Sequence, residues 1–141
     1  MMKLKFITMF SLVFVLMLSS FSMVQADTKD RKFSIGKDQG FTTIAKKENK
    51  SGVYLKVTKG KKFLVSVFAD ANKGKGKRKW VNVSGASGGS LGTYVTAGKT
   101  YRLTNYAVER YGKNVPIRIL VENRDQRGSE RAEFLWSPDS R

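Results

Sequence analysis

The 141-residue chain contains no cysteine and no histidine, and these two absences exclude several kinds of chemistry. Without cysteine it forms no disulfide, offers no thiol nucleophile and has no thiolate metal site. Without histidine it lacks the imidazole of Ser-His-Asp and Cys-His relays and a usual ligand of zinc. We therefore predict a protein that is not an enzyme and that uses no metal and no other cofactor.

Acidic residues are also scarce, with 11 Asp and Glu against 27 Lys and Arg and a formal net charge of +16. A charge this far from zero points to anionic partners or surfaces. The excess is uneven: residues 27–79 hold 16 basic and 5 acidic side chains, whereas residues 80–141 hold 9 and 6. The basic excess therefore lies mainly in residues 27–79.

Long hydrophobic runs are absent except near the start of the chain. Lys3 and Lys5 precede an apolar run over residues 6–18, which a polar stretch and Val24-Gln25-Ala26 follow. This order is that of a secretory signal peptide, and the run is shorter than the roughly 20 residues that a membrane anchor, the alternative, needs. We predict a signal peptide over residues 1–26, cleavage near Ala26 and a secreted, extracellular protein. The exported chain would hold 25 basic and 11 acidic residues, a net charge of +14.

The rest of the chain alternates between apolar and polar residues, as strands do. In residues 52–59, for example, Val53, Leu55 and Val57 share one face. The same reasoning predicts strands over residues 80–84, 93–96, 100–106, 115–123 and 129–136, and a weaker one over residues 41–45. Residues 62–69 are almost continuously apolar instead, as expected of a central strand. Such short, regularly spaced strands predict an all-β fold, a small antiparallel β-sandwich of about seven to eight strands, with a small β-barrel as the alternative.

The segments between and beyond these strands give further expectations. Gly60-Lys61 and Ala97-Gly98-Lys99 are typical of tight hairpins. Residues 27–40 are expected to form a flexible basic arm, residues 41–136 a single domain, and residues 137–141 a frayed tail. On the outer faces of the last two strands, Glu122 beside Arg118 and Glu133 beside Arg131 are typical of ion pairs across neighbouring strands.

The densest positive charge lies between two expected strands, where five of the seven residues from Lys73 to Lys79 are basic and the other two are glycine. Like charges repel and glycine favours neither helix nor strand, so this segment is predicted to be a mobile loop. A cationic loop can bind a polyanion, and Trp80 at its base offers a stacking face. The predicted polyanion-binding residues are Lys73, Lys75, Lys77, Arg78, Lys79 and Trp80. The alternative is that the charge only keeps the protein soluble.

A second candidate surface combines Tyr and Arg side chains: Tyr101, Arg102, Arg110 and Tyr111. Such pairs stack on sugar rings or form protein interfaces. Ordinary sheet packing is the explanation we favour, because tyrosine has a high strand propensity.

Two other patterns carry no site. Gly98-Lys99-Thr100 contains the end of a phosphate-binding motif, but Thr93 stands where that motif needs glycine and strands flank it on both sides, so we predict no nucleotide. The carboxylates include no pair marked for acid and base chemistry.

These observations predict a secreted, non-enzymatic basic protein that docks on polyanionic polymers of a cell envelope or the extracellular space. The expected partner is an anionic polymer or a cell surface, and an unidentified protein partner stays open. The alternative is a secreted antimicrobial, bacteriocin-like protein or an inhibitor of a foreign enzyme. Because the pattern is strand-rich, it disfavours an amphipathic helix that forms pores.

Overall fold

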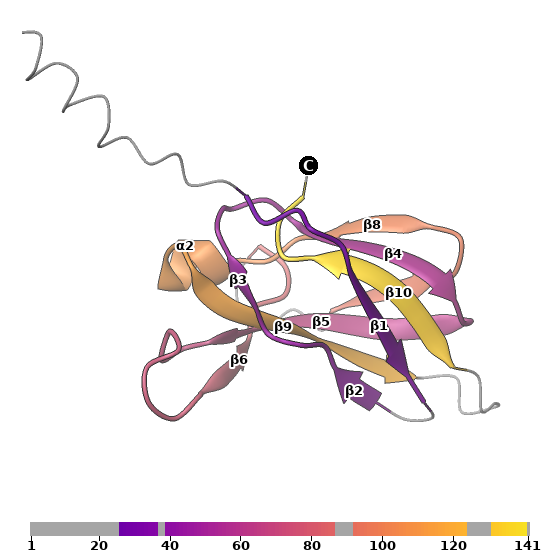
Figure 1. The fold of residues 1–141 in the computed structure, drawn as a ribbon, viewed down its shortest axis with the longest axis horizontal. Helices are drawn as coiled ribbons and strands as arrows, with labels where there is room; N and C mark the ends of the chain where they lie inside the picture. Colours follow the sequence, from indigo (N-terminus) through magenta and orange to yellow (C-terminus); the bar gives the residue numbers. More distant parts are fainter. Residues whose placement is uncertain (1–25, 37–38, 87–91, 124–130, 141) are drawn as a thin grey trace, which may run out of the picture.

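A computed structural model of the chain describes residues 26–36, 39–86, 92–123 and 131–140. Residues 1–25, which hold nearly all of the predicted signal peptide, lie outside the described residues, as do residues 87–91 and 124–130. Figure 1 shows the elements, which are β1 (Arg31–Ile35), β2 (Gln39–Phe41), β3 (Ala45–Lys47), β4 (Val53–Lys59), β5 (Lys62–Asp70), β6 (Trp80–Asn82), β7 (Thr93–Thr96), β8 (Thr100–Leu103), α2 (Ala107–Tyr111), β9 (Val115–Asn123) and β10 (Ala132–Ser137).

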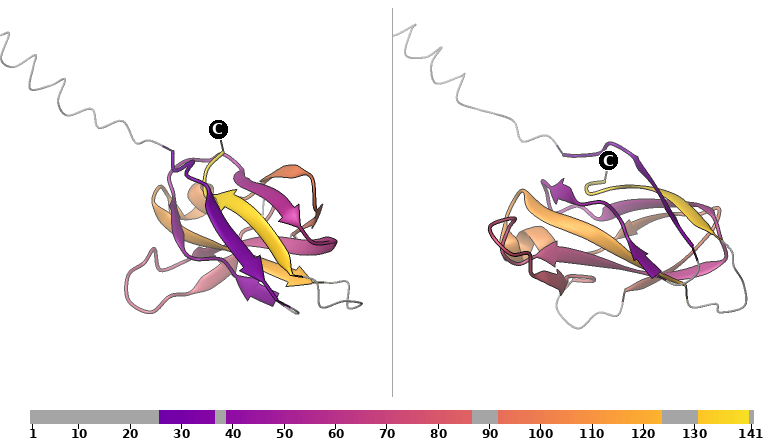
Figure 2. Two further views of the ribbon diagram at one scale, coloured as in Figure 1. Left: turned by 45° about the vertical axis from the view of Figure 1, so that its right-hand side comes forward. Right: turned by 60° about the horizontal axis from the view of Figure 1, so that its bottom comes forward.

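The strands form two antiparallel sheets that face each other (Figures 1 and 2). The four-stranded sheet has the order β1-β10-β4-β8. The six-stranded sheet has the order β2-β9-β5-β6, with β3 also paired to β9 and β7 to β5. Among the described strands the sheets do not close into a barrel. The predicted all-β sandwich is therefore confirmed, with ten described strands where about seven to eight were expected.

The core lies between the inner faces of the two sheets, as the alternation predicts. Val53, Leu55 and Val57 of β4 are at most 2% exposed. The odd-numbered residues of β9 from Val115 to Val121 are buried in the same core. Burial of such side chains stabilises each sheet against the other by roughly 25 cal/mol for each Å² removed from water.

The hairpin predicted at Gly60-Lys61 is wrong, because β4 belongs to the four-stranded sheet and β5 to the six-stranded sheet. A two-residue hairpin would place Val57 opposite Leu64, and the buried odd-numbered residues of the two strands would then face opposite sides. Because the chain crosses from one sheet to the other between β4 and β5, the odd-numbered residues of both strands can face the core. Gly60 makes the crossing possible, since its φ of 117° is strained for other residues and a Cβ there would strike the ring of Phe63.

The hairpin predicted around residues 97–99 is wrong for a similar reason. Strand β7 pairs with β5 and strand β8 pairs with β4, so this connection also runs from one sheet to the other. Val95 and Leu103 consequently enter the core from opposite sides. The sequence pattern also missed α2, whose five residues are too few for a helical period to be visible.

Residues 27–40, predicted as a flexible arm, instead contribute to both sheets. Strand β1 pairs with β10 along its full length, from Arg31 opposite Trp136 to Ile35 opposite Ala132. Its Phe33 ring packs on Phe134, with ring centroids 5.2 Å apart. The next strand, β2, pairs with β9. The polar and charged residues that suggested an arm lie on an edge strand, where one face and one edge remain in water.

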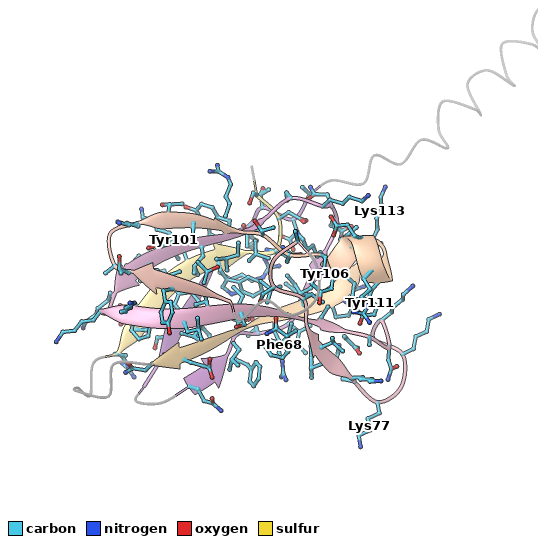
Figure 3. The ribbon with its side chains drawn as sticks, turned by 180° about the vertical axis from the view of Figure 1, so that it is seen from behind. Phe68, Lys77, Tyr101, Tyr106, Tyr111 and Lys113 are labelled. Atoms are coloured by element: carbon cyan, nitrogen blue, oxygen red, sulfur yellow. The ribbon has the colours of Figure 1, made fainter. Side chains whose placement is uncertain are left out.

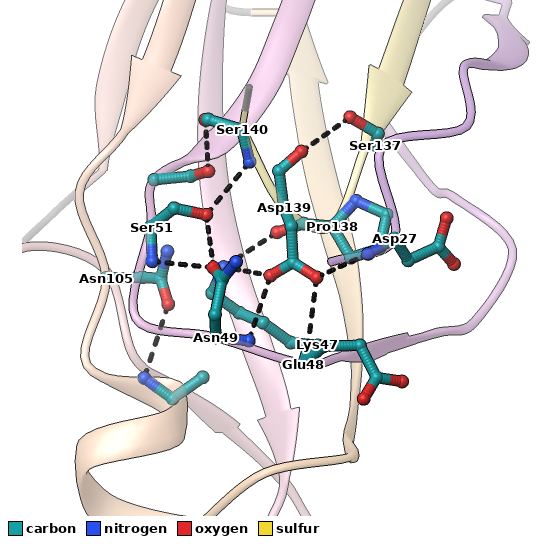
Figure 4. A network of polar contacts seen from close by, with 12 residues as sticks. Asp27, Lys47, Glu48, Asn49, Ser51, Asn105, Ser137, Pro138, Asp139 and Ser140 are labelled. Carbon is teal, nitrogen blue, oxygen red and sulfur yellow. Dashed lines mark hydrogen bonds and ion pairs between the residues drawn. The ribbon is translucent and has the colours of Figure 1, made fainter. Parts of the chain in front are cut away.

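The predicted frayed tail is also wrong, because Asp139 is fully buried. One Asp139 carboxylate oxygen accepts the backbone N–H groups of Asp27 at 2.9 Å and Glu48 at 3.1 Å. The other oxygen accepts the Asn49 N–H at 3.3 Å and lies 3.0 Å from Lys47 Nζ. Figure 4 shows this network, which we call the Asp139 clamp and which joins both ends of the described chain to β3.

Lys47 within the clamp is as deeply buried as its partner, with a side chain 1% exposed. Burial lowers the pKa of Lys47, while the hydrogen bond and the charge of Asp139 act in the opposite direction. Lys47 Nζ also donates to the Pro138 carbonyl at 2.7 Å. The two buried charges are thus paired and further hydrogen-bonded, as burial of an ion pair requires.

Replacing Asp139 by alanine is expected to lower the free energy of unfolding by about 3 to 5 kcal/mol, because the buried Lys47 loses its ion-pair partner and three amides lose their acceptor. Urea denaturation followed by circular dichroism measures the change. Asp30→Asn is the matched control, since Asp30 is exposed. Equal stability of the two variants would contradict the role assigned to the clamp.

Candidate functional site

The Lys-rich segment is a hairpin loop between β5 and β6, which pair directly. The last residue of β5, Asp70, is fully buried and accepts the backbone N–H groups of Asn72 at 2.9 Å, Gly74 at 2.8 Å and Lys79 at 3.0 Å. The Ala71 N–H donates to the Lys79 carbonyl at 2.7 Å and closes the base of the loop. The predicted loop is confirmed in position, but this buried carboxylate holds its backbone, which the prediction of a mobile loop did not foresee.

The environment of Asp70 favours its ionised form. Burial alone raises the pKa of this carboxyl, but the amides of Lys79, Asn72 and Gly74, together with the charge of Arg78, outweigh burial and leave the pKa below its ordinary value. Asp70 is therefore a permanent anion at neutral pH. It anchors the backbone of a loop whose cationic side chains repel one another.

The loop presents its cations to water. Its four lysines are exposed, and among the described residues none of them has an ion pair. They are Lys73, Lys75, Lys77 and Lys79. Figure 3 places Lys77 at the far end of the loop, pointing away from the sandwich. Three residues of the loop adopt left-handed backbone angles, and two of them are the glycines that tolerate it, Gly74 with a φ of 78° and Gly76 with a φ of 65°.

Trp80 begins β6 and is half-buried, so it is not the open stacking face that the sequence suggested. The guanidinium carbon of Arg78 lies 5.7 Å from the centroid of its ring, and that of Arg118 lies 4.1 Å away. Arg118 also stacks on Phe41 at 3.7 Å. The indole therefore already contacts two cations of the protein itself.

Sequence reasoning missed Arg118 and Phe41 as members of this site. The alternation of β9 correctly places Arg118 on the outer face, but its predicted ion pair with Glu122 is wrong, because no carboxylate among the described residues pairs with Arg118. Arg118 lies opposite Phe68 of β5 instead. Only the pairing of β2 with β9 brings Phe41 here, and no sequence signal revealed that pairing.

The second predicted surface is not one surface. Tyr101 packs against the core, and its hydroxyl accepts the Thr96 N–H at 2.9 Å, which lowers the pKa of Tyr101. The adjacent Arg102 is exposed on the other face of β8. Arg110 lies over the ring of Tyr111 on α2, 5.5 Å from its centroid. Tyr101 and Tyr111 lie at opposite ends of the molecule in Figure 3.

Other sites of the described residues are less suited to a ligand. Both fully buried carboxylates, Asp70 and Asp139, are engaged by amides and cations. A hollow over β1 and β10 is lined by two charged residues of opposite sign, Lys32 and Glu133, among apolar and hydroxyl side chains. No group of three or more acidic side chains in the described ranges could hold a metal ion. The one described helix is too short to cross a membrane.

The fold and this loop define a small, basic β-sandwich protein with an exposed cationic hairpin. The chain belongs to the protein family described as "Protein of unknown function (DUF2712)", whose match spans residues 19–140. No curated protein matches the chain. A solved structure titled "Structure of infectious bursal disease virus Gx strain" is similar over 79% of this chain, with 9% identity and a TM-score of 0.40. The chain spans 31% of that viral chain, and so loose a likeness supports no functional argument.

Replacing Asp70 by asparagine is expected to loosen the loop and to destabilise the protein by about 1 to 3 kcal/mol, the cost of leaving buried amides poorly paired. Hydrogen exchange of the Asn72, Gly74 and Lys79 amides, followed by NMR, measures the loss of protection. Glu109→Gln, at an exposed acid of α2, is the control.

Acid is expected to have the same effect on the unmodified protein. Because the pKa of Asp70 is lower in the folded chain, the unfolded chain binds this proton first, and the stability that Asp70 contributes is lost as the pH falls below about 3.9. Protection that is unchanged at acid pH and in Asp70→Asn would show that the carboxylate does not hold the loop.

Proposed function

We propose that this protein is exported and binds polyanionic polymers of the cell envelope or the extracellular space through the hairpin loop of residues 71–79, without catalysing a reaction. The observation that carries this proposal is the arrangement of the loop. Five cationic side chains stand in seven residues, and the one acid at the base of the loop, Asp70, is enclosed by backbone amides.

The fixed backbone favours binding. Each lysine that contacts an anionic polymer displaces a counterion, which supplies a salt-dependent driving force. Because Asp70 already holds the loop backbone, less conformational freedom is lost when the polymer binds than with an unstructured chain. The same charges on a disordered segment would bind at a larger entropic cost.

A secreted antimicrobial, bacteriocin-like protein or inhibitor is the second candidate, and it shares the same first step, because positive charge concentrates a protein on anionic surfaces. Cell viability separates the two functions. A passive binding protein leaves the coated cells alive, whereas an antimicrobial protein lowers the viable count.

The protein beginning at Asp27 is expected to sediment with intact bacterial cells at low salt and to be released at high salt, with viable counts unchanged. Replacing Lys73, Lys75, Lys77 and Lys79 together by glutamine is expected to lower the bound fraction about tenfold or more, because four counterion-releasing contacts are lost. Neutralising four exposed lysines elsewhere, Lys56, Lys59, Lys99 and Lys113, removes the same charge and is the control.

If both variants lose binding equally, total charge rather than the loop binds the polymer. Binding that does not respond to salt contradicts the polyanion proposal. A loss of viable cells in the same tubes favours the antimicrobial candidate.

Export is supported by the position of Asp27 in the Asp139 clamp. The Asp27 nitrogen lies 2.9 Å from the Asp139 carboxylate, and cleavage after Ala26 would turn this amide into an ammonium group. A charged donor to a carboxylate is stronger than a neutral one by about 1 kcal/mol. Cleavage after Ala26 therefore places the new amine of Asp27 beside an acceptor that the fold already provides, the Asp139 carboxylate.

The chain beginning at Asp27 with a free amine is expected to be about 1 kcal/mol more stable than the same chain with an acetylated amine, since acetylation keeps the N–H donor and removes its charge. Urea denaturation at low and high salt measures this difference. Equal stability would mean that the free amine does not occupy the clamp.

A further inference from the structure

The outer face of the six-stranded sheet carries a second cationic feature beside the Lys-rich loop. Arg118 of β9 lies there between two aromatic rings, Phe41 of β2 at 3.7 Å and Trp80 of β6 at 4.1 Å from its guanidinium carbon. The strand order brings these rings from opposite sides of β9. Phe68, opposite Arg118, supports the Phe41 ring edge-on with centroids 5.9 Å apart. Figure 3 shows Phe68 on this face.

Within the part of the chain that the structure describes, no acidic side chain compensates the charge of Arg118. The buried Nε atom of Arg118 likewise has no hydrogen-bond partner among the described residues. Burial lowers the pKa of Arg118, and the positive charge of Arg78 lowers it further. Arg78 is 42% exposed, and its contact to Asp70 is long, at 3.4 Å. The guanidinium groups of Arg78 and Arg118 therefore both lie near the indole of Trp80, and their like charges repel each other.

Two such groups favour a tetrahedral oxyanion over a planar one. A carboxylate directs the lone pairs of its two oxygens in one plane, so it best suits guanidinium forks that share that plane. A phosphate group has oxygens in several directions, so one group can accept hydrogen bonds from two forks that do not share a plane. We propose that Arg78 and Arg118 form a subsite for a phosphate group of a phosphodiester polymer, and this inference rests on the proposed polyanion-binding function.

The same face argues against nucleic acid as the polymer. Proteins that bind single-stranded nucleic acid offer aromatic faces on which bases stack. Here the rings of Phe41 and Trp80 already stack on the guanidinium of Arg118. The subsite suits a phosphodiester chain that has no bases, such as a polyol phosphate, with the Lys-rich loop following the neighbouring phosphates.

The emission of Trp80 can report on this subsite, because the only other tryptophan, Trp136, is fully buried. Titrations of the chain beginning at Asp27 with poly(glycerol phosphate) and with polyglutamate, at equal charge and salt, compare the two chemistries. We expect tighter binding and a larger change in emission with poly(glycerol phosphate).

Arg118→Lys keeps the charge and removes the planar fork. We expect about a tenfold loss of affinity for poly(glycerol phosphate), which corresponds to the loss of one charge-assisted contact. For polyglutamate we expect less than about a twofold change in affinity. Arg102→Lys, at an exposed arginine of β8, is the matched control and is expected to change neither. Arg78→Lys tests the same prediction at an exposed loop residue whose replacement leaves the packing of Phe41 intact.

Each outcome decides between alternatives. Equal affinity for both polymers, or an equal loss for both in the two lysine variants, overturns the phosphate subsite but leaves polyanion binding standing. Tighter binding to a base-containing oligonucleotide, or to phosphatidylglycerol vesicles at equal phosphate, overturns the choice of a soluble polyol phosphate. If the unmodified protein binds none of these probes, the proposed function fails together with the subsite.

Discussion

The ion pair between Lys47 and Asp139 is the contact on which the arrangement of the sandwich depends. Lys47 ends β3 in the six-stranded sheet, and Asp139 follows β10 in the four-stranded sheet, so the pair joins the two layers. Asp139 also accepts the amide of Asp27, which fixes the approach to β1. A buried pair of this kind is weak evidence for high stability, since desolvation opposes the attraction. The pair contributes specificity instead, because few other arrangements of the two chain ends would leave both buried charges paired.

The protein uses the same device at the Lys-rich loop. Asp70, like Asp139, is a fully buried carboxylate surrounded by backbone N–H groups, and it holds an irregular segment for which no strand partner is available. A carboxylate can accept several hydrogen bonds at once, which makes it suited to organising a turn. With no cysteine in the chain, buried carboxylates do here what disulfides do in many small secreted domains.

The sequence reveals which residues face the core far better than it reveals which strands pair. The alternation in β4 and β9 predicts their buried faces correctly. Strand β5 is apolar almost throughout, so its sequence does not show which residues face inward. The sequence therefore also hides the fact that odd-numbered residues of both β4 and β5 face the core, which is what excludes a hairpin between them. Edge strand β1 was missed because it is charged and short.

The candidate site shows the same limit. The Lys-rich loop is visible as composition, and its position between two strands follows directly from the sequence. The stack of Phe41 on Arg118 depends on a pairing between residues about 80 positions apart, for which a single sequence carries no local signal. Asp70 was visible only as one carboxylate among several, since its three amide donors come from the folded turn.

The meeting of Asp27 and Asp139, near the two ends of the described residues, has a mechanical consequence. Strands β1 and β10 are antiparallel, and Arg31 lies opposite Trp136, so the ends leave the sandwich from the same side. A force that pulls these ends apart would load the β1–β10 hydrogen bonds one after another and peel β1 away, rather than shear them all together. The fold is therefore poorly suited to carrying tension between these two ends.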